Sequence, residues 1–457
     1  MVKSWSNRLE APKLSLSSSF RDNQDYQVEA MRILFLAHRL PYPPTKGDKI
    51  RSFWQLRTLQ QRHEVDLFCF YDDPGDRHQL TNVHAYCHSC YAERVSVFQS
   101  RIRAAAALLR GQCFSAAFFW SSSMARRIAE AVATRRYDLI FVFGSSMAQY
   151  AAPWPCLPRI LDMVDVDSDK WAQYGDYKHG LLSRLWKLEG CRLATYEAAL
   201  VRSFSNTLVC TEAEAQVLQR RVPEGRISVL QNWLDMDYFR PDSVLIPEKI
   251  RDLQPYVIFT GTMDYLPNID AAQFFCREIL PIVRSRVPDL RFVVAGRNPP
   301  PEVVSLAADP AIYVTGTVAD IRPYLAGAAV AVAPMRIARG VQNKILEALA
   351  MDVPVVASSL AATALPQELA SLLVAESEPH RFADRVTSYL TLSEPSRSRR
   401  DSVKRHFESL DLASQLEGYL LTASVRVAET RALTVIDRRP QGYMEMSRAG
   451  QATVEGS

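Results

Sequence analysis

Short apolar runs alternate along the chain with longer stretches of helical periodicity. Five apolar runs in the first half predict buried strands, at residues 32–37, 65–71, 139–143, 159–163 and 207–210. Five more follow in the second half, at residues 256–260, 290–296, 312–316, 329–333 and 353–357. Continuous apolar strands separated by helices are typical of parallel sheets that are covered on both faces. The pattern therefore predicts an α/β protein with two Rossmann-like, doubly wound domains that face each other across a cleft.

The helical stretches and the prolines suggest where these domains begin and end. Helices are predicted at residues 50–61, 267–286 and 343–351, and another after Thr211, which stands at an N-cap position with Glu214 at the capping-box position. Residues 232–255 contain three prolines and resemble a linker. We expect a first domain over residues 31–240 and a second over 241–425, with the amphipathic stretch 403–421 packing back across the interface. The polar ends, residues 1–30 and 426–457, predict a disordered extension and a disordered tail.

Composition and charge exclude several classes of protein. The formal net charge of the 457-residue chain is only +4, which provides no basis for binding nucleic acid through its phosphates. The eight cysteines are spread along the chain, which is typical of reduced thiols in a cytoplasmic protein. No apolar run approaches the ~20 residues that span a bilayer. We expect a cytoplasmic protein that is soluble, or at most peripheral at the inner face of the cell membrane.

Residues 98–120 leave two interpretations open. They mix arginines with leucine, phenylalanine and tryptophan. Such a segment can rest on a membrane surface near a lipid-linked acceptor. Packing of a helix into the core is the interpretation that the pattern favours.

The segment 333–351 carries the clearest chemistry. A predicted strand ends at Ala333, a basic loop containing Gly340 follows, and a helix begins near Asn343. Free backbone N–H groups at a helix start suit a diphosphate. Cations stand close by, at Arg336, Arg339 and Lys344. One turn into the helix, the carboxylate of Glu347 can accept hydrogen bonds from ribose hydroxyls. The alternative is a solvated basic loop in front of an ordinary amphipathic helix.

This segment resembles a known family. Residues 346–350, Leu-Glu-Ala-Leu-Ala, and residues 354–357, Pro-Val-Val-Ala, look like the nucleotide-sugar site of GT-B glycosyltransferases of family four. In that family two glutamates lie eight residues apart; the second matches Glu347, whereas Arg339 stands in place of the first. The run 337–347 is most similar to the sugar transferases associated with PEP-CTERM/exosortase exopolysaccharide loci. Further matching motifs lie at residues 38–52, 165–171, 261–268 and 314–324.

The resemblance implies a retaining glycosyltransferase without cofactor or metal. It would move a sugar from a nucleotide-sugar donor to a glycan or lipid-linked acceptor in exopolysaccharide biosynthesis. The donor-binding residues it implies are Gly47, Gly261, Thr317, Val318, Gly340, Val341, Gln342, Asn343 and Glu347. The catalytic residues that we expect are Arg336, Arg339 and Lys344 at the diphosphate, with His38 and Asp165 or Asp167 at the sugars. The family commonly carries an arginine and a lysine in the loop that follows Gly261. This chain has neither between residues 261 and 268, so we expect the three cations of the later loop to replace them.

Other activities are less consistent with the sequence. A dehydrogenase would need Gly-x-Gly-x-x-Gly after a strand, and the first predicted strand is not followed by it. His84, Cys87, His88 and Cys90 form a local cluster, but no second ligand pair follows at zinc-site spacing. Asp165 and Asp167 would share a face in an extended segment, although a metal there is not favoured. A nucleotide-sugar epimerase of the same fold and a non-catalytic nucleotide-binding scaffold remain alternatives.

Overall fold

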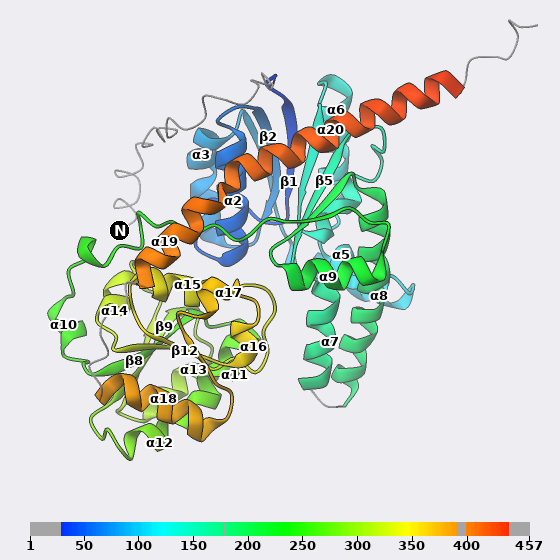
Figure 1. Cartoon of the computed structure of the whole chain (residues 1–457). Coiled ribbons are helices and arrows are strands. Elements are labelled where there is room, and N and C mark those ends of the chain that lie inside the picture. The colour runs from blue at the N-terminus through cyan, green and yellow to red at the C-terminus, as the bar shows by residue number, and fades with distance from the viewer. Residues whose placement is uncertain (1–28, 178–179, 392–398, 438–457) are drawn as a thin grey trace, which may run out of the picture. The chain divides into compact units, whose positions relative to one another are not determined.

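The computed structural model describes residues 29–177, 180–391 and 399–437 (Figure 1). The chain divides into two units, residues 1–30 and residues 31–457, and all that follows concerns the second. The extension predicted over residues 1–30 lies almost entirely outside the described residues, as does the part of the tail after residue 437.

The first half forms one parallel sheet of seven strands in the order β3-β2-β1-β4-β5-β6-β7. The strands are β1 (Arg32–Ala37), β2 (Glu64–Tyr71), β3 (Ser89–Arg94), β4 (Leu139–Phe143), β5 (Arg159–Val164), β6 (Asn206–Val209) and β7 (Ile227–Val229). Successive side chains of β1 point to opposite faces of the sheet. Ile33 and Phe35 pack into one hydrophobic core, and Leu34 and Leu36 pack into another. All four are fully buried, which explains why the strand has no polar residue after Arg32.

Helices connect these strands. The longer ones are α2 (Gly47–Leu59), α4 (Val97–Leu109), α6 (Ser122–Thr134), α7 (Asp167–Tyr177), α8 (Leu181–Ser203) and α9 (Glu212–Arg221). Two short ones are α3 (Leu80–Val83) and α5 (Phe114–Phe118). The side chain of Thr211 accepts from the N–H of Glu214, so the predicted N-cap of α9 is confirmed. Figure 1 shows α7 and α8 side by side as a helical hairpin.

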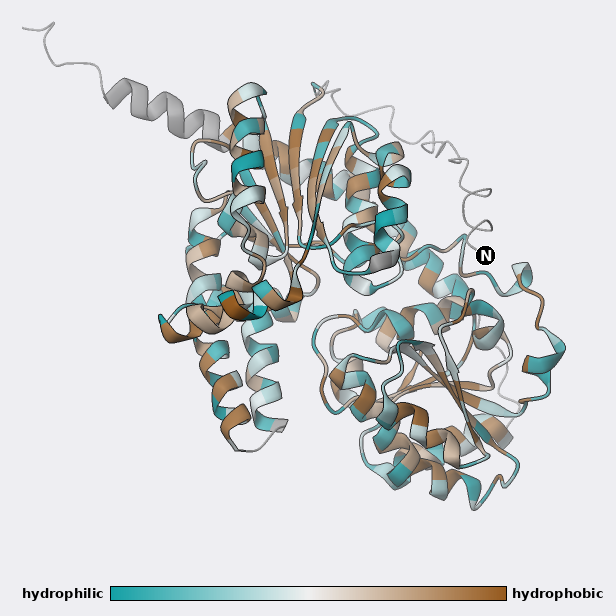
Figure 2. Cartoon of the chain, turned by 180° about the vertical axis from the view of Figure 1, so that it is seen from behind, coloured by the Kyte–Doolittle hydropathy of each residue, from teal (hydrophilic) through white to brown (hydrophobic). Residues whose placement is uncertain are grey.

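The second half forms a parallel sheet of six strands in the order β10-β9-β8-β11-β12-β13. They are β8 (Tyr256–Thr262), β9 (Arg291–Arg297), β10 (Ile312–Gly316), β11 (Val330–Ala333), β12 (Val355–Ala357) and β13 (Val374–Ala375). The strands of both sheets are mostly hydrophobic, whereas the helices around them alternate between hydrophobic and hydrophilic positions (Figure 2). The predicted fold class is therefore confirmed.

The helices of the second half include the one that follows the basic loop, α15 (Asn343–Ala350). Its longer helices are α11 (Leu266–Phe274), α15 (Asn343–Ala350) and α18 (Pro379–Thr391), and α11 continues through a π-turn into α12 (Leu280–Arg284). Shorter ones are α10 (Glu248–Arg251), α13 (Pro301–Val304), α14 (Arg322–Ala326), α16 (Ser359–Ala362) and α17 (Gln367–Ala370).

The last two helices join the cores of both halves. Val403 of α19 (Arg399–Leu410) packs into the core of the second sheet. Leu412, Leu416 and Leu420 of α20 (Leu412–Asp437) pack into the core of the first. The stretch 403–421 thus packs back across the two halves, as the sequence predicts.

Four features differ from the sequence prediction. The edge strands β3, β7 and β13 were not predicted, because each is short or carries polar residues. The linker 232–255 contains the short helix α10. Residues 426–437 belong to α20 rather than to a disordered tail, since they contain good helix formers and neither glycine nor proline. The core-packing interpretation of residues 98–120 is wrong for Phe98 and Leu109 of α4, which are 75% and 88% exposed.

Candidate functional site

The starts of helices α2 and α15 meet. A Cβ atom on Gly47, the first residue of α2, would lie 3.7 Å from Nδ2 of Asn343, the first residue of α15. The side chains of the N-cap residues, Lys46 and Gln342, make no capping hydrogen bond. Asn232 donates from Nδ2 to Oδ1 of Asn343 at 3.1 Å. The positive ends of two helix dipoles therefore lie together, an arrangement that favours an anion.

Lys344 and Glu347 add two groups that titrate near neutral pH. The Nζ of Lys344 donates to Oδ1 of Asn268 at 2.7 Å and lies 4.9 Å from the ring centre of Phe259. Burial lowers the pKa of Lys344 to about 8, against the attraction of Glu347. Burial raises the pKa of Glu347 to about 7, against the attraction of Lys344. Perturbed groups of this kind cluster at functional sites.

The other two predicted cations are paired with carboxylates. Arg336 forms a bidentate pair with Asp270, with Nε 3.0 Å from Oδ2, and lies 4.6 Å from the ring centre of Phe274. Arg339 places Nη2 2.7 Å from Asp169 and Nη1 3.4 Å from Glu214. Their charges are therefore partly compensated, and Lys344 is the predicted cation closest to the start of α15.

Gly340 lies against Asp165. Its φ is +58°, and a Cβ there would lie 2.7 Å from the Cγ of Asp165 and overlap the oxygen Oδ1. Asp165 accepts from the thiol of Cys210 at 2.9 Å, and burial raises its pKa. The backbone N–H of Val341 also bonds to Cys210, which follows β6. The loop before α15 therefore contacts the chain after β5, at Asp165, and after β6, at Cys210. A side chain at position 340 has no room.

The expected extended arrangement of Asp165 and Asp167 is wrong. Val164, the last residue of β5, has a φ of +67°, which is strained for a β-branched residue and turns the chain. Asp167 therefore begins α7, where it pairs with Lys170, instead of lying beside Asp165.

His38 lies at the carboxyl end of β1. Its Nε2 is 3.4 Å from Oδ2 of Asp48, and its ring stacks on Phe143 at 5.7 Å. Burial opposes ionisation of Asp48, but the hydrogen bond from His38 and the charge of Arg39 outweigh it and lower the pKa of that carboxyl. The Nδ1 atom of His38 is buried and has no hydrogen-bond partner among the described residues.

The remaining predicted donor residues follow strands β8 and β10. A Cβ on Gly261 would lie 2.7 Å from Nδ2 of Asn268, the residue whose Oδ1 accepts from Lys344, so this position belongs to the same cluster. Thr317 is exposed and Val318 partly buried in the loop after β10. Both lie in the loop after β10, whereas residues 336–347 lie after β11 and in the first part of α15.

Arg297 was missed by the sequence interpretation. It ends β9, and its Nη1 donates to Oγ1 of Thr45 at 3.0 Å, in the loop before α2. Its Nη2 is buried and has no hydrogen-bond partner in the described part of the chain. The available signal was an arginine at the carboxyl end of a parallel strand, the edge where such sheets bind ligands.

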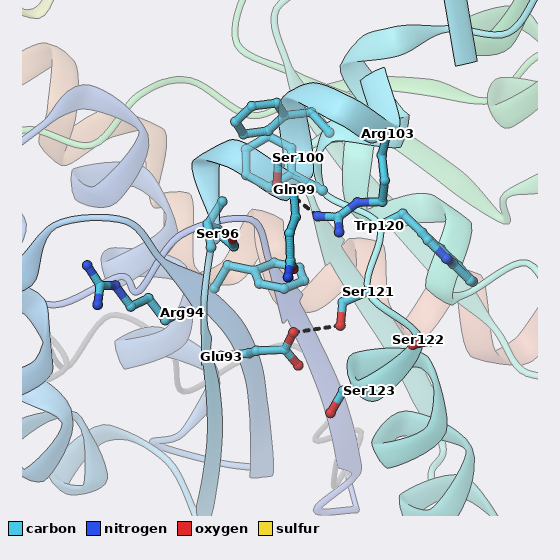
Figure 3. Close-up of a pocket in the computed structure, with 14 residues that line it drawn as sticks. Glu93, Arg94, Ser96, Gln99, Ser100, Arg103, Trp120, Ser121, Ser122 and Ser123 are labelled. Atoms are coloured by element: carbon cyan, nitrogen blue, oxygen red, sulfur yellow. Dashed lines mark hydrogen bonds between the residues drawn. The ribbon is translucent and has the colours of Figure 1, made fainter. Parts of the chain in front are cut away.

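A pocket of about 410 Å³ lies beside His38 in the first half (Figure 3). Its lining includes Glu93 at the end of β3, Arg103 of α4, and the segment 118–123 before and at the start of α6. Glu93 accepts from the hydroxyl of Ser121 at 2.6 Å, and Arg103 donates to Ser100 at 2.9 Å. Phe119, another lining residue, meets the ring of His38 edge-on at 5.6 Å.

The second half of the chain matches the model of a known protein family. Residues 254–391 match the family model described as "Glycosyl transferases group 1". Among curated protein sequences, none matches the chain significantly.

Solved structures show the same fold over most of the chain. Sucrose-phosphate synthase from Thermosynechococcus elongatus is similar with a TM-score of 0.57 and 14% identity, covering 89% of this chain and 100% of that one. The Anabaena protein HepE in complex with UDP and glucose has a TM-score of 0.55 and 14% identity, covering 88% and 100%. A glycosyltransferase from Rickettsia africae has a TM-score of 0.58 and 13% identity, covering 86% and 98%. The family match and the GT-B-like fold together support an enzyme of the glycosyltransferase class.

Among the described residues, no group of three or more His, Cys, Asp and Glu side chains is arranged to hold a metal ion. Nor does any helix in the described ranges have the length and apolar character needed to cross a membrane.

Proposed function

We propose that the chain is a retaining glycosyltransferase that transfers a sugar from a nucleotide-sugar donor to a glycan or lipid-linked acceptor in exopolysaccharide biosynthesis. The observation that carries this proposal is the meeting of two helix starts at Gly47 and Asn343, with Lys344 and Glu347 on the second helix. The resemblance to the PEP-CTERM/exosortase-associated subgroup supports the choice of biosynthetic role.

In this proposal the diphosphate of the donor binds at the two helix starts. The N–H groups of Gly340, Gln342 and Asn343 and of Gly47 donate to its oxygens, and Lys344 adds a positive charge. Arg297 lies close to the same loop and supplies the charge that the loop after Gly261 lacks. When the bond between the sugar C1 and the diphosphate oxygen breaks, its electron pair stays on the diphosphate; the acceptor hydroxyl oxygen forms the new bond to C1 and gives its proton to a diphosphate oxygen. Fixed donors and cations stabilise that developing charge, and this is the main catalytic contribution.

The nucleoside and the two sugars occupy flanking positions. Glu347 accepts hydrogen bonds from the ribose hydroxyls, and the loop with Thr317 and Val318 contacts the base. Asp165 and His38 lie at the carboxyl ends of β5 and β1 and orient the sugars. Arg336 and Arg339 also contribute positive charge. Asp270 partly neutralises the charge of Arg336, and Asp169 and Glu214 partly neutralise that of Arg339.

Nucleotide binding is the first test of this function. Thermal-shift measurements with UDP, GDP, ADP and CMP should show stabilisation by at least one of them. Glu347→Gln should weaken that binding about tenfold, since it removes a charged acceptor from the ribose hydroxyls. Glu302→Gln, at an exposed position of the same half, should leave binding unchanged.

Product analysis separates transfer from other chemistry. Mass spectrometry of reactions with a panel of nucleotide sugars and lipid-linked acceptors should detect a glycosylated acceptor. Turnover of the donor without any acceptor would instead indicate an epimerase. If none of the four nucleotides raised the Tm, the proposed donor site would be refuted.

A further inference from the structure

Helix α4 carries apolar side chains on its outward face. Phe98, Ile102 and Leu109 are 75%, 55% and 88% exposed, and Ala105 between them is also exposed. Positions 98, 102, 105 and 109 recur at helical spacing, so these residues form one stripe, which we call the α4 outer face. The inward side has Ser100 and Ala107, both buried. The helix is thus more apolar toward the outside than toward the protein, the reverse of an ordinary surface helix.

Arginines flank the α4 outer face. Arg101 within α4 and Arg110 at its end are exposed, and the chain has no acidic residue from position 95 to position 112. Apolar side chains that alternate with long cationic ones suit an interface with an anionic lipid surface. The apolar groups enter the acyl boundary, while the guanidinium groups reach the headgroups.

A second copy of the chain fits this face less well. Two such faces in contact would bring arginines against arginines. A single stripe of four side chains is also much smaller than the roughly 800 Å² per partner that stable protein interfaces bury. A lipid bilayer does not require a minimum contact area of this kind, and anionic headgroups carry the negative charge that complements the arginines.

We propose that the α4 outer face docks the protein on the surface of an anionic lipid bilayer. The inner side of the same helix, with Ser100 and Arg103, lines the pocket of Figure 3. Docking therefore brings this pocket close to the headgroups, where it receives the polar end of a membrane-anchored acceptor. That last step rests on the proposed function, whereas docking itself does not.

The test is flotation of the purified full chain with vesicles. Binding is expected to vesicles of phosphatidylglycerol and phosphatidylcholine in equal parts, and to fall as salt increases. The triple variant Phe98→Ser, Ile102→Ser, Leu109→Ser should bind at least about tenfold more weakly, because three large apolar side chains no longer enter the bilayer. Arg101→Glu with Arg110→Glu should reduce binding to anionic vesicles selectively.

A matched control removes the same kind of side chain elsewhere. Leu245, Val304 and Leu360 are 92%, 51% and 41% exposed in the second half. Their triple replacement by serine should leave vesicle binding unchanged. Both triple variants should keep the wild-type Tm, since none of the six side chains is buried.

Three results would overturn the proposal. The first is wild-type binding to vesicles that is absent or unaffected by the α4 variant. The second is loss of binding with Leu181→Ser and Leu182→Ser, which are exposed at the start of α8, instead of with the α4 variant. The third is a change of oligomeric mass on removing the α4 outer face, which would make it a contact between copies. Nucleotide stabilisation of the same variants is measured in parallel, so that failure of docking and failure of the donor site are distinguishable.

Discussion

The guanidinium of Arg339 lies 2.7 Å from the carboxylate of Asp169, although the two residues are 170 positions apart in the chain. Asp169 belongs to α7 and also pairs with Arg221, while Arg339 reaches Glu214 of α9 as well. Arg339 stands where the family that this chain resembles has its first glutamate. In this structure the arginine contributes to an ion-pair network between the loop before α15 and the helices of the first sheet.

Replacement of Arg339 should therefore affect stability more than donor binding. Arg339→Gln leaves the buried carboxylate of Glu214 without its cation, and we expect a loss of about 1–2 kcal/mol, because these groups are only partly exposed. Lys344→Gln should weaken nucleotide-diphosphate affinity more than Arg339→Gln does, since its Nζ bonds to the neutral amide of Asn268 and forms no direct ion pair with any described residue. Chemical denaturation and calorimetric titration with the best nucleotide measure the two effects.

An exposed arginine of the second half provides the control. Arg385→Gln should change neither quantity. A larger loss of affinity with Arg339→Gln than with Lys344→Gln would mean that Arg339 leaves Asp169 and binds the diphosphate.

Gly340→Ala tests the close approach to Asp165. The new methyl group would overlap the carboxylate and also adopt a φ of +58°, so we expect a loss of at least about 2–3 kcal/mol. Gly316→Ala is the matched variant, because Gly316 has a φ of +65° with nothing within 4 Å of the new Cβ. It should lose only about 1 kcal/mol from backbone strain. Equal losses in the two variants would show that the loop moves away from Asp165 at no cost.

The sequence predicts the strands of this fold better than it predicts which side chains form ion pairs. Buried runs such as residues 32–37 are unambiguous because both faces of the strand are covered. The edge strand β3 carries Ser89, Glu93 and Arg94, and a mixed polar pattern of this kind also suits a loop. The start of α15 was predictable from a glycine, a basic loop and a helix pattern. The partners of Arg336 and Arg339 were not, because Asp270 and Asp169 lie far away in sequence and only the tertiary fold brings them close.

Arg297→Gln should weaken donor binding about tenfold or more, because its Nη2, which has no hydrogen-bond partner among the described residues, is available to the diphosphate. Thr45→Val is the informative companion. It removes the hydrogen bond from Arg297 Nη1 without removing the charge, so it should have a smaller effect on affinity. Titration with a nucleoside diphosphate and with the matching nucleoside separates the contributions: only the diphosphate should lose affinity in Arg297→Gln. Equal losses for both ligands would place Arg297 outside the diphosphate site.

Donor affinity should depend on pH in a bell-shaped manner. Glu347 has a pKa of about 7, so its carboxylate becomes available to the ribose as the pH rises through that value. Lys344 has a pKa of about 8, so its positive charge is lost as the pH rises further. Affinity is therefore expected to peak between about pH 7 and pH 8. Glu347→Gln should remove the acidic limb and leave the basic one, and titrations over the range measure both.

Glu347→Gln should also stabilise the fold at alkaline pH while it weakens binding. The raised pKa of Glu347 means that the folded protein holds a proton which the unfolded chain has already released, so stability falls as the pH rises from about 4.5 to about 7. A neutral glutamine removes this fall. The variant should have a higher Tm than the wild type at pH 8 and about the same Tm near pH 5. A lower Tm at pH 8 would show that the attraction of Lys344 outweighs the burial of the carboxylate, and that Glu347 is retained for stability rather than for the donor.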